Sequence, residues 1–233
     1  MKNQIRWLGH AAFEITSAKG RKILIDPWIS GNPACPLKVE DLATPDLVLI
    51  THDHQDHYGI DIPVLLEKGQ GILLTQPEVI EKVRKEGVPE EKIVNHGSGM
   101  NIGGTVEIKE IKVTMTQATH SSGVGSPCGF IVTLEDGKVI YHAGDTGIFS
   151  SMELFGELYN INVALLPIGS VFVMDSLQAA TSLKLLKPRI AIPMHYKTFP
   201  ILEQSADKFV AEAKEKAPFV EVKVLKPGEH IMV

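Results

Sequence analysis

The stretch THDHQDHYG, residues 51–59, places three histidines and two aspartates within six positions. It directly follows the apolar run DLVLIT, which is typical of a buried strand. Because side chains alternate along an extended loop, His52 and His54 are expected to point the same way, with Asp56 and His57 just beyond, where a helix begins. Imidazole and carboxylate groups suit zinc, iron or manganese. A loop that only hydrogen-bonds is the alternative, but clustered imidazoles without a cation would leave several groups unsatisfied.

The composition is that of an ordinary globular protein. The chain has 233 residues, is 44% hydrophobic and 22% charged, and carries a formal net charge of −5. Its length suits one domain with a large core, or two packed halves, and we predict a single domain over residues 1–233. The sequence has no basic stripe, which disfavours nucleic acid as a partner. No apolar run is long enough for a membrane span or a signal-peptide core, so we expect no membrane association and a cytoplasmic location. Cys35 and Cys128 are too few for a disulfide framework.

Glycine and proline punctuate a series of short β-branched and amphipathic segments. A capping-box spacing at Asp175 and Gln178 marks one helix start, and Asp136-Gly137 suits a hairpin turn. Strands are expected at residues 4–9, 12–16, 22–26, 46–51, 105–118, 129–135, 138–145, 161–169 and 189–195. Helices are expected at residues 61–69, 76–87, 150–160, 175–188 and 202–217, with a closing hairpin at 220–233.

This order of elements indicates the architecture. Strands lead, a strand–helix alternation follows, and the same pattern then repeats. Two mixed sheets between outer helices would cover all the apolar faces. The fold class expected is therefore α/β, as a four-layer αββα sandwich.

Three more candidate metal ligands stand at the ends of apolar runs. His120 ends KVTMTQATH, Asp145 ends VIYHAGD, and His195 ends RIAIPMH. Any one of them alone is easily explained as a structural residue. Their shared placement favours ligation, because one loop cannot complete two coordination shells and sheet proteins commonly place sites at the carboxyl ends of strands.

These residues carry a resemblance. The sequences THDHQDH, a strand-end histidine, GDTG and PMH, in this order, resemble the metallo-β-lactamase superfamily over nearly the whole chain. The stretches WLGHAAF, THSSG, YHAGDTGIF, LLPIG and PMHYKTFP are similar to one branch of it, a group of largely uncharacterised metal-dependent hydrolases related to the ascorbate-6-phosphate lactonases.

The resemblance implies the αββα sandwich and a site for two divalent metal ions about 3.5–4 Å apart. Zinc is the first expectation, and manganese or iron would also accept these ligands. Asp56 and Asp145 would be the catalytic carboxylates. Carried over residue by residue, His52, His54 and His120 would hold the first metal, Asp56, His57 and His195 the second, and Asp145 would bridge them.

The expected reaction is hydrolysis, in which a metal-bound hydroxide attacks a phosphodiester or a lactone-type substrate. Two ions, two aspartates and a hydroxide sum to a charge of roughly +1, which favours a small anionic substrate. Lys197, two residues past His195, would add to that charge. His10, in the turn LGHAA, is a candidate donor to a metal ligand or a substrate contact; a turn histidine with a structural hydrogen bond is the equal alternative.

Departures from the family pattern narrow the function. β-Lactamases of the superfamily typically carry a cysteine where Asp145 stands, and flavin-linked di-iron relatives carry a glutamate where His54 stands, so antibiotic hydrolysis and redox chemistry are disfavoured. Two alternatives stay open: a metal-dependent nuclease, and an inactive metal-dependent sensor or binding protein. A homo-oligomer is compatible with the sequence.

The remaining polar candidates are assigned structural or solvated roles. His142, three residues before Asp145, would point the opposite way along its strand. His96 and His230 are expected in solvated surface turns. Ser121 and Ser122 adjoin His120, but no base with an orienting partner is evident for a serine nucleophile. Asp175 and Gln178 receive only their capping role, and whether segment 170–178 shapes substrate choice stays open.

Overall fold

A computed structural model describes residues 2–67 and 69–233. Within it the chain forms two compact units, which are described in turn. The prediction of one domain over residues 1–233 stays a prediction. Unit 1 comprises Met1–Thr105, Ser121–Ser126 and Lys226–Val233, and unit 2 comprises Val106–His120 and Pro127–Leu225.

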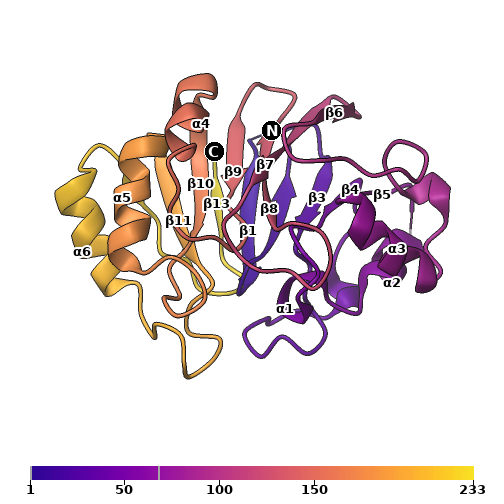
Figure 1. The fold of residues 1–233 in the computed structure, drawn as a ribbon, viewed down its shortest axis with the longest axis horizontal. Helices are drawn as coiled ribbons and strands as arrows, with labels where there is room; N and C mark the ends of the chain where they lie inside the picture. Colours follow the sequence, from indigo (N-terminus) through magenta and orange to yellow (C-terminus); the bar gives the residue numbers. More distant parts are fainter. Residues whose placement is uncertain (1, 68) are drawn as a thin grey trace. The chain divides into compact units, whose positions relative to one another are not determined.

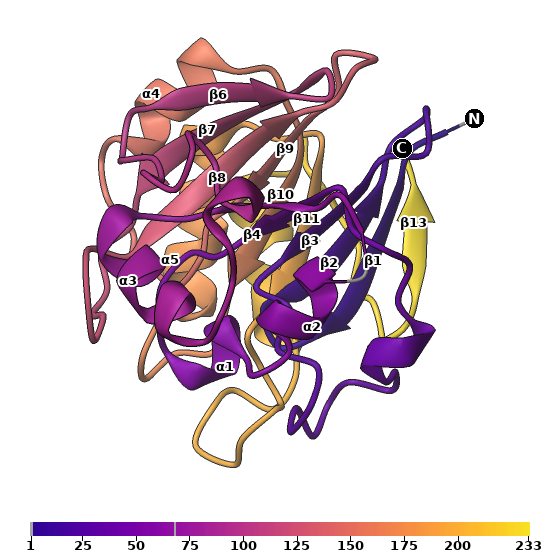
Figure 2. The ribbon, with the colours of Figure 1, turned by 90° about the vertical axis from the view of Figure 1, so that its right-hand side faces the viewer.

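Unit 1 is built on a mixed sheet with the strand order β13-β1-β2-β3-β4-β5 (Figure 1). The strands from β13 to β3 pair antiparallel, and β3, β4 and β5 pair parallel. Figure 2 shows the end of the chain, in yellow, beside its indigo start, where β13 pairs with β1. The strands are β1 (Gln4–Gly9), β2 (Ala12–Thr16), β3 (Lys22–Ile25), β4 (Leu47–Leu49), β5 (Ile72–Leu74) and β13 (His230–Met232).

The helices of unit 1 lie in the chain between strands β3, β4 and β5 and directly after β5. Pro77 occupies the first turn of α3, where its missing N–H has no intrahelical partner to lose. The apolar face of α3, which includes Val79 and Val83, joins a buried cluster with Val48 of β4 and Leu73 of β5. The helices are η1 (Val39–Asp41), α1 (Gln55–Tyr58), α2 (Ile62–Glu67), α3 (Pro77–Lys85) and η2 (Glu90–Lys92).

Unit 2 is built on a second mixed sheet, with the order β12-β11-β10-β9-β8-β7-β6. The strands from β12 to β9 are parallel, and β9, β8 and β7 pair antiparallel. The expected turn between β8 and β9 is present, with Gly137 at φ +82°. The strands are β6 (Thr105–Ile108), β7 (Ile111–Gln117), β8 (Cys128–Thr133), β9 (Val139–His142), β10 (Ile161–Pro167), β11 (Ile190–Met194) and β12 (Glu221–Val222).

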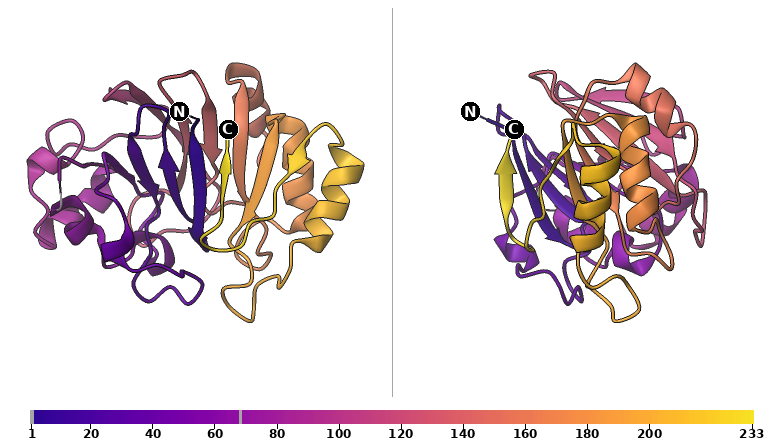
Figure 3. Two further views of the ribbon diagram at one scale, coloured as in Figure 1. Left: turned by 180° about the vertical axis from the view of Figure 1, so that it is seen from behind. Right: turned by 90° about the vertical axis from the view of Figure 1, so that its left-hand side faces the viewer.

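The helices of unit 2 lie side by side in the order α4, α5, α6 (Figure 3). Asp175 caps α5 as expected, since its Oδ1 accepts the N–H of Gln178 at 2.8 Å. The Gln178 side chain, however, accepts the N–H of Ile148 at 3.4 Å, which ties the cap to the loop after β9. The helices are α4 (Met152–Leu158), α5 (Ser176–Leu186) and α6 (Asp207–Lys216).

Three expectations are corrected. The closing hairpin over residues 220–233 is wrong: β12 extends the unit 2 sheet beside β11, whereas β13 pairs with β1 in unit 1. The chain therefore changes sheet between these strands, which local pattern cannot reveal. His230 lies in β13 rather than in a turn, although it is exposed as expected. Strand β5, which pairs parallel with β4, was not anticipated.

Among the described residues, no helix combines the length and apolar character that crossing a membrane requires.

Candidate metal-binding site

The histidine loop of unit 1 leaves the buried strand β4 and enters α1. His52 and His54 lie together, with Nε2 of His52 2.9 Å from Nδ1 of His54, which agrees with side chains that point the same way. The other ring nitrogen of His52, Nδ1, lies 3.0 Å from Oγ1 of Thr51. Because Thr51 fixes one side of the ring, Nε2 of His52 is the atom that can reach a cation.

His57 is held by a buried carboxylate that the sequence argument missed. Its Nδ1 lies 2.8 Å from Oδ2 of Asp26, and both side chains are fully buried. Asp26 also accepts the Thr51 N–H at 2.8 Å and the Thr51 hydroxyl at 2.7 Å. A histidine that donates one ring N–H to a carboxylate presents its other nitrogen to a metal, with ring orientation and tautomer set. Asp26 therefore makes Nε2 of His57 the ligand atom.

His10 is placed against Asp56. Its Nε2 lies 3.0 Å from Oδ2 of Asp56, and its side chain is fully buried. The His10 backbone has φ +54°, and its carbonyl accepts the indole N–H of Trp7 at 2.9 Å. Trp28 contacts the imidazole edge-on, with 5.5 Å between ring centroids. The ring is thus fixed on several sides and can orient the Asp56 carboxylate.

The strand ends of unit 2 gather the other three candidates. Oδ2 of Asp145 lies 3.0 Å from Nε2 of His195 and 3.6 Å from Nε2 of His120. Both β9 and β11 run parallel to β10, so the residues that follow them, Asp145 and His195, emerge at one edge of the sheet. His120 follows β7, which the antiparallel β8 turns into the same direction as β9. Strand topology explains why residues 75 positions apart meet.

Gly169, in the loop after β10, lies against His195. A Cβ atom at position 169 would stand 2.2 Å from the His195 carbonyl oxygen and 3.0 Å from its Nδ1. The 2.2 Å contact is far shorter than real Cβ atoms show and the 3.0 Å contact is tight, so any side chain at position 169 would force the backbone of His195 to shift. The G of LLPIG is a structural requirement of the histidine's position.

The donor sets of the two units fit divalent cations. In unit 1, ligand atoms of His10, Asp56 and His57 all lie within 4.8 Å of one another. In unit 2, one carboxylate oxygen of Asp145 lies close to the Nε2 atoms of both His120 and His195. Imidazole and carboxylate together are ligands for zinc, manganese or iron, and buried groups of this kind are costly to gather without a cation.

The other candidates divide as follows. Lys197 is exposed, with φ +63°, and its backbone N–H is bonded to the carbonyl of Glu203 at 2.8 Å. His142 is buried within β9, and its Nδ1 accepts the N–H of Gly144 at 3.1 Å, which agrees with a structural role. His96 is exposed, as expected. Ser122 donates its hydroxyl to Oδ1 of Asp53 at 2.9 Å, which is no arrangement for a nucleophile.

Asp53 and Asp26 are the polar residues of this region that sequence reasoning overlooked. Burial alone would raise the pKa of Asp53, but hydrogen bonds from the Ser122 hydroxyl and from the N–H groups of Gly123 and Val124 outweigh it and hold the pKa below its usual value. Asp26 directly follows the apolar strand β3. The strand-end rule that selected Asp145 and His195 would have found Asp26 too.

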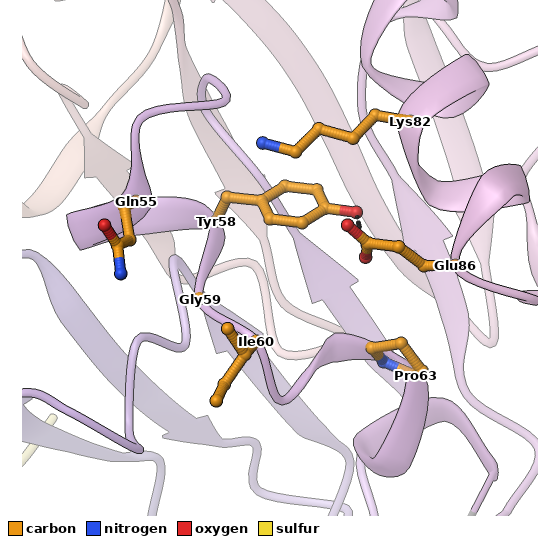
Figure 4. Close-up of a pocket in the computed structure, with 7 residues that line it drawn as sticks. All are labelled: Gln55, Tyr58, Gly59, Ile60, Pro63, Lys82 and Glu86. Carbon is orange, nitrogen blue, oxygen red and sulfur yellow. Dashed lines mark hydrogen bonds between the residues drawn. The ribbon is translucent and has the colours of Figure 1, made fainter.

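A pocket opens beside α1 in unit 1 (Figure 4). It has a volume of about 280 Å³ and is lined by Gln55 and Tyr58 of α1, with Ile60, Lys82 and Glu86. The Tyr58 hydroxyl donates to Oε2 of Glu86 at 2.6 Å, and Nζ of Lys82 lies 4.1 Å from the centre of the Tyr58 ring. Burial and the Glu86 carboxylate raise the pKa of Tyr58. Tyr58 and Glu86 are thus engaged with one another, and Lys82 also donates to the carbonyl oxygen of Asp53.

Comparison with known proteins gives consistent results. The family model described as "Beta-lactamase superfamily domain" matches residues 21–196. The chain is 47% identical to a UPF0173 metal-dependent hydrolase of Nitratidesulfovibrio vulgaris (strain DP4), over 99% of this chain and 95% of that protein. It is 46% identical to a UPF0173 metal-dependent hydrolase of Caldivirga maquilingensis, over 97% of this chain and 96% of that protein. Igni18, a metallo hydrolase from Ignicoccus hospitalis, has 36% identity and a TM-score of 0.88, covering 100% of this chain and 99% of that one.

These matches confirm the expected superfamily and fold class, α/β with two mixed sheets and associated helices. The finer likeness to ascorbate-6-phosphate lactonases stays a prediction.

Proposed function

Since the chain belongs to the β-lactamase superfamily domain family, we propose that it is a metal-dependent hydrolase with a binuclear centre. The hydrolase class follows from the family and from relatives that carry that name. In the proposed assignment, His52, His54 and His120 hold the first metal, Asp56, His57 and His195 the second, and Asp145 bridges them. Zinc is the first candidate, and manganese or iron would suit the same donors.

The observation that carries the binuclear assignment is the position of Asp145. A carboxylate that binds a single ion needs to lie near the other ligands of that ion only. Here a single oxygen faces both His120, proposed for the first metal, and His195, proposed for the second. That is the position from which a carboxylate can serve both centres.

Bound divalent ions would lower the pKa of water and polarise the electrophile. The chain's own residues supply orientation. Asp26 holds Nδ1 of His57, which would leave Nε2 as the atom that could bind the second metal. His10 holds one oxygen of Asp56, and Thr51 bridges Asp26 and His52 through its hydroxyl. Asp56 and Asp145 place the negative charge that such a centre requires.

We propose a small anionic substrate, a phosphodiester or a lactone bearing an acidic group. The buried Asp26 carboxylate lowers the charge sum counted from the sequence, from roughly +1 to roughly 0. A net positive field alone therefore does not select an anionic substrate. The anion would be recognised by direct contact with the metals, and Lys197 at the end of β11 would supply the added positive charge.

The experiment combines metal analysis with an activity screen. Untagged protein, saturated and then dialysed, should hold about two ions per chain and turn over phosphodiester or lactone substrates. At most one tightly held ion would overturn the binuclear assignment. Two ions with no turnover on any ester, lactone or phosphodiester would favour a sensor or binding protein, and tight salt-dependent binding of single-stranded oligonucleotide would favour a nuclease. A cytoplasmic location remains part of the proposal.

A further inference from the structure

Asp53 stands between His52 and His54 in the chain, yet its carboxylate binds a different segment. Its Oδ1 accepts the Ser122 hydroxyl at 2.9 Å, the Gly123 N–H at 2.7 Å and the Val124 N–H at 3.2 Å. Successive backbone N–H groups that converge on one oxygen form an anion-binding concavity. The anion that fills this one is the chain's own side chain.

The fit between Asp53 and this segment is close. A Cβ atom at Gly123 would stand 2.7 Å from Oδ2 and 3.1 Å from Oδ1 of Asp53. Lys82 approaches the other side of Asp53, with Nζ 3.2 Å from the carbonyl oxygen and 3.8 Å from Oδ2. The carboxylate is therefore engaged on both oxygens.

A second side chain fastens the same segment. Oε1 of Gln76 accepts the Ser126 N–H at 2.9 Å, and Nε2 of Gln76 donates to the Ser126 carbonyl. Asp53 follows β4 and Gln76 follows β5, which are neighbouring parallel strands. Residues 121–126, here called the SSGVGS loop, are thus tied at two points to adjacent strand ends of unit 1.

The SSGVGS loop has little else to hold it. Most of its residues are exposed, and its apolar side chain, Val124, is 40% exposed. Each ordered residue costs about 1–2 kcal/mol in backbone entropy, so polar ties must supply the order that packing does not. The loop begins immediately after His120. On the proposed function, Asp53 therefore lies between two ligands of the first metal in the chain and holds the loop that continues from the third.

We propose that Asp53 is a positioning residue for the first metal. By holding the SSGVGS loop through Oδ1, Asp53 fixes the backbone that immediately follows His120. The backbone of Asp53 itself sets the separation of His52 and His54. This inference rests on the proposed function, because it takes these three histidines as ligands of one ion. Asp53 itself is not a ligand in this assignment.

The test compares Asp53→Asn and Asp53→Ala with the control Asp136→Asn. Asp136 is an exposed carboxylate that also accepts a backbone N–H, from Lys138 at 3.1 Å, but on the β8–β9 turn. Hydrogen exchange of metal-free protein should show the SSGVGS loop exchanging at least about tenfold faster in Asp53→Ala, with an intermediate effect in Asp53→Asn because an amide oxygen still accepts. The control should leave the loop unchanged.

Zinc alone is the probe for the second readout, by competition with a chromophoric chelator. Asp53→Ala should lower the affinity for one of the two zinc ions by about 10–100-fold, the range for residues that orient ligands. The affinity for the other ion should be unchanged. If Asp53→Ala does not fold, Gly123→Ala breaks the same contact from the loop side and should give the same pattern.

The outcomes separate the two claims. Faster loop exchange with both zinc affinities unchanged would make Asp53 a loop anchor only and overturn the positioning role, as would unchanged exchange. Equal weakening of both ions would also overturn it. Fewer than two ions in the wild-type protein would instead overturn the proposed binuclear function.

Discussion

The candidate ligands of unit 1 and those of unit 2 are held in place by different means. In unit 1, His52, His54, Asp56 and His57 come from one short loop, and each contacts a neighbouring side chain such as Thr51, Asp26 or His10. In unit 2, His120, Asp145 and His195 come from three separate strand ends and contact one another. His52 and His54 also contact one another, but the rest of the first cluster is held by side chains outside it, whereas sheet topology brings the second cluster together.

The difference predicts where each cluster is vulnerable. A single substitution of an orienting residue should disturb unit 1, because each hydrogen bond sets one ring or one carboxylate. In unit 2 the shared partner is Asp145 itself, so its loss should affect both histidines together. Five predictions are ordered from the largest expected effect to the smallest, and the first three test this contrast directly.

Asp145→Asn should have the largest effect. The substitution keeps the size of the side chain but removes its charge. It also replaces one carboxylate oxygen by an NH2 group, which can donate but cannot bind a metal as an anionic oxygen does. We expect weaker binding of at least one metal and a loss in kcat of at least about 10²-fold. Asp145→Cys should retain zinc but turn over poorly with manganese, because thiolate is a soft ligand.

Steady-state kinetics with elemental analysis of the same preparations would measure both effects. Two bound metals and near-normal turnover in Asp145→Asn would mean that Asp145 is an ordinary strand-end carboxylate, and the contrast between the two clusters would collapse.

Asp26→Asn should be the most damaging change to an orienting residue in unit 1. An amide can donate to Nδ1 of His57, which would place the proton on Nε2 and remove the nitrogen that faces the metal. One ion should bind about 10–100-fold more weakly. Asp46→Asn is a matched control, since Asp46 accepts a backbone N–H from Lys22 at 2.9 Å in the same sheet. Chelator competition measures the affinities, and equal losses in both variants would contradict the orienting role.

His57→Ala belongs to the same comparison. Because His57 is assigned to one centre, the variant should lose one ion at lower chelator concentration than the other.

Lys197→Ala should have a smaller effect, limited to anion binding. If Lys197 adds positive charge near the end of β11, inorganic phosphate should inhibit the wild-type enzyme competitively and the variant a few-fold less strongly. Lys184→Ala, exposed on α5, is the control. Inhibition constants that are the same in all three proteins would remove Lys197 from the site.

The smallest effect is expected from two of the buried tyrosines, Tyr58 in unit 1 and Tyr141 in unit 2. Burial and Glu86 raise the pKa of Tyr58, and burial raises that of Tyr141. A raised folded-state pKa means that the stability these groups contribute is complete below the unfolded value near 10 and is lost as the pH rises above it. At pH 10.5 each of these two tyrosines should lower the free energy of unfolding by about 0.8 kcal/mol relative to neutral pH.

Urea unfolding at pH 8 and pH 10.5, with phenolate absorbance in parallel, measures this loss. Tyr58→Phe should remove only the share of Tyr58 and leave that of Tyr141. Phenolate formation by both tyrosines at pH 10 in the folded protein would contradict the predicted burial effect.

The sequence predicts the fold class and the strands that carry the candidate ligands, because hydrophobic periodicity and the glycines and prolines between elements are local properties of the chain. The ring nitrogens of His52 and His54 lie 2.9 Å apart, as side chains that point the same way along an extended loop can. The closing hairpin failed because β12 and β13 pair with strands far away in the sequence. Asp26 stands at a strand end as Asp145 does, so the same rule could have selected it, but its contact with His57 appears only in the fold. Asp53 carries no such positional signal, and its role depends on the SSGVGS loop that the fold brings beside it.

Gly169 has a consequence for how variation in this chain should be interpreted. In a deep mutational library scored by activity, position 169 would rank beside the metal ligands, although it contributes no chemical group, because any Cβ there displaces the backbone and ring of His195. Ranking by activity loss alone would therefore count a glycine among the reactive residues. Scoring the same library for folded yield and for metal retention would separate it, since crowding at Gly169 should release a metal from protein that still folds.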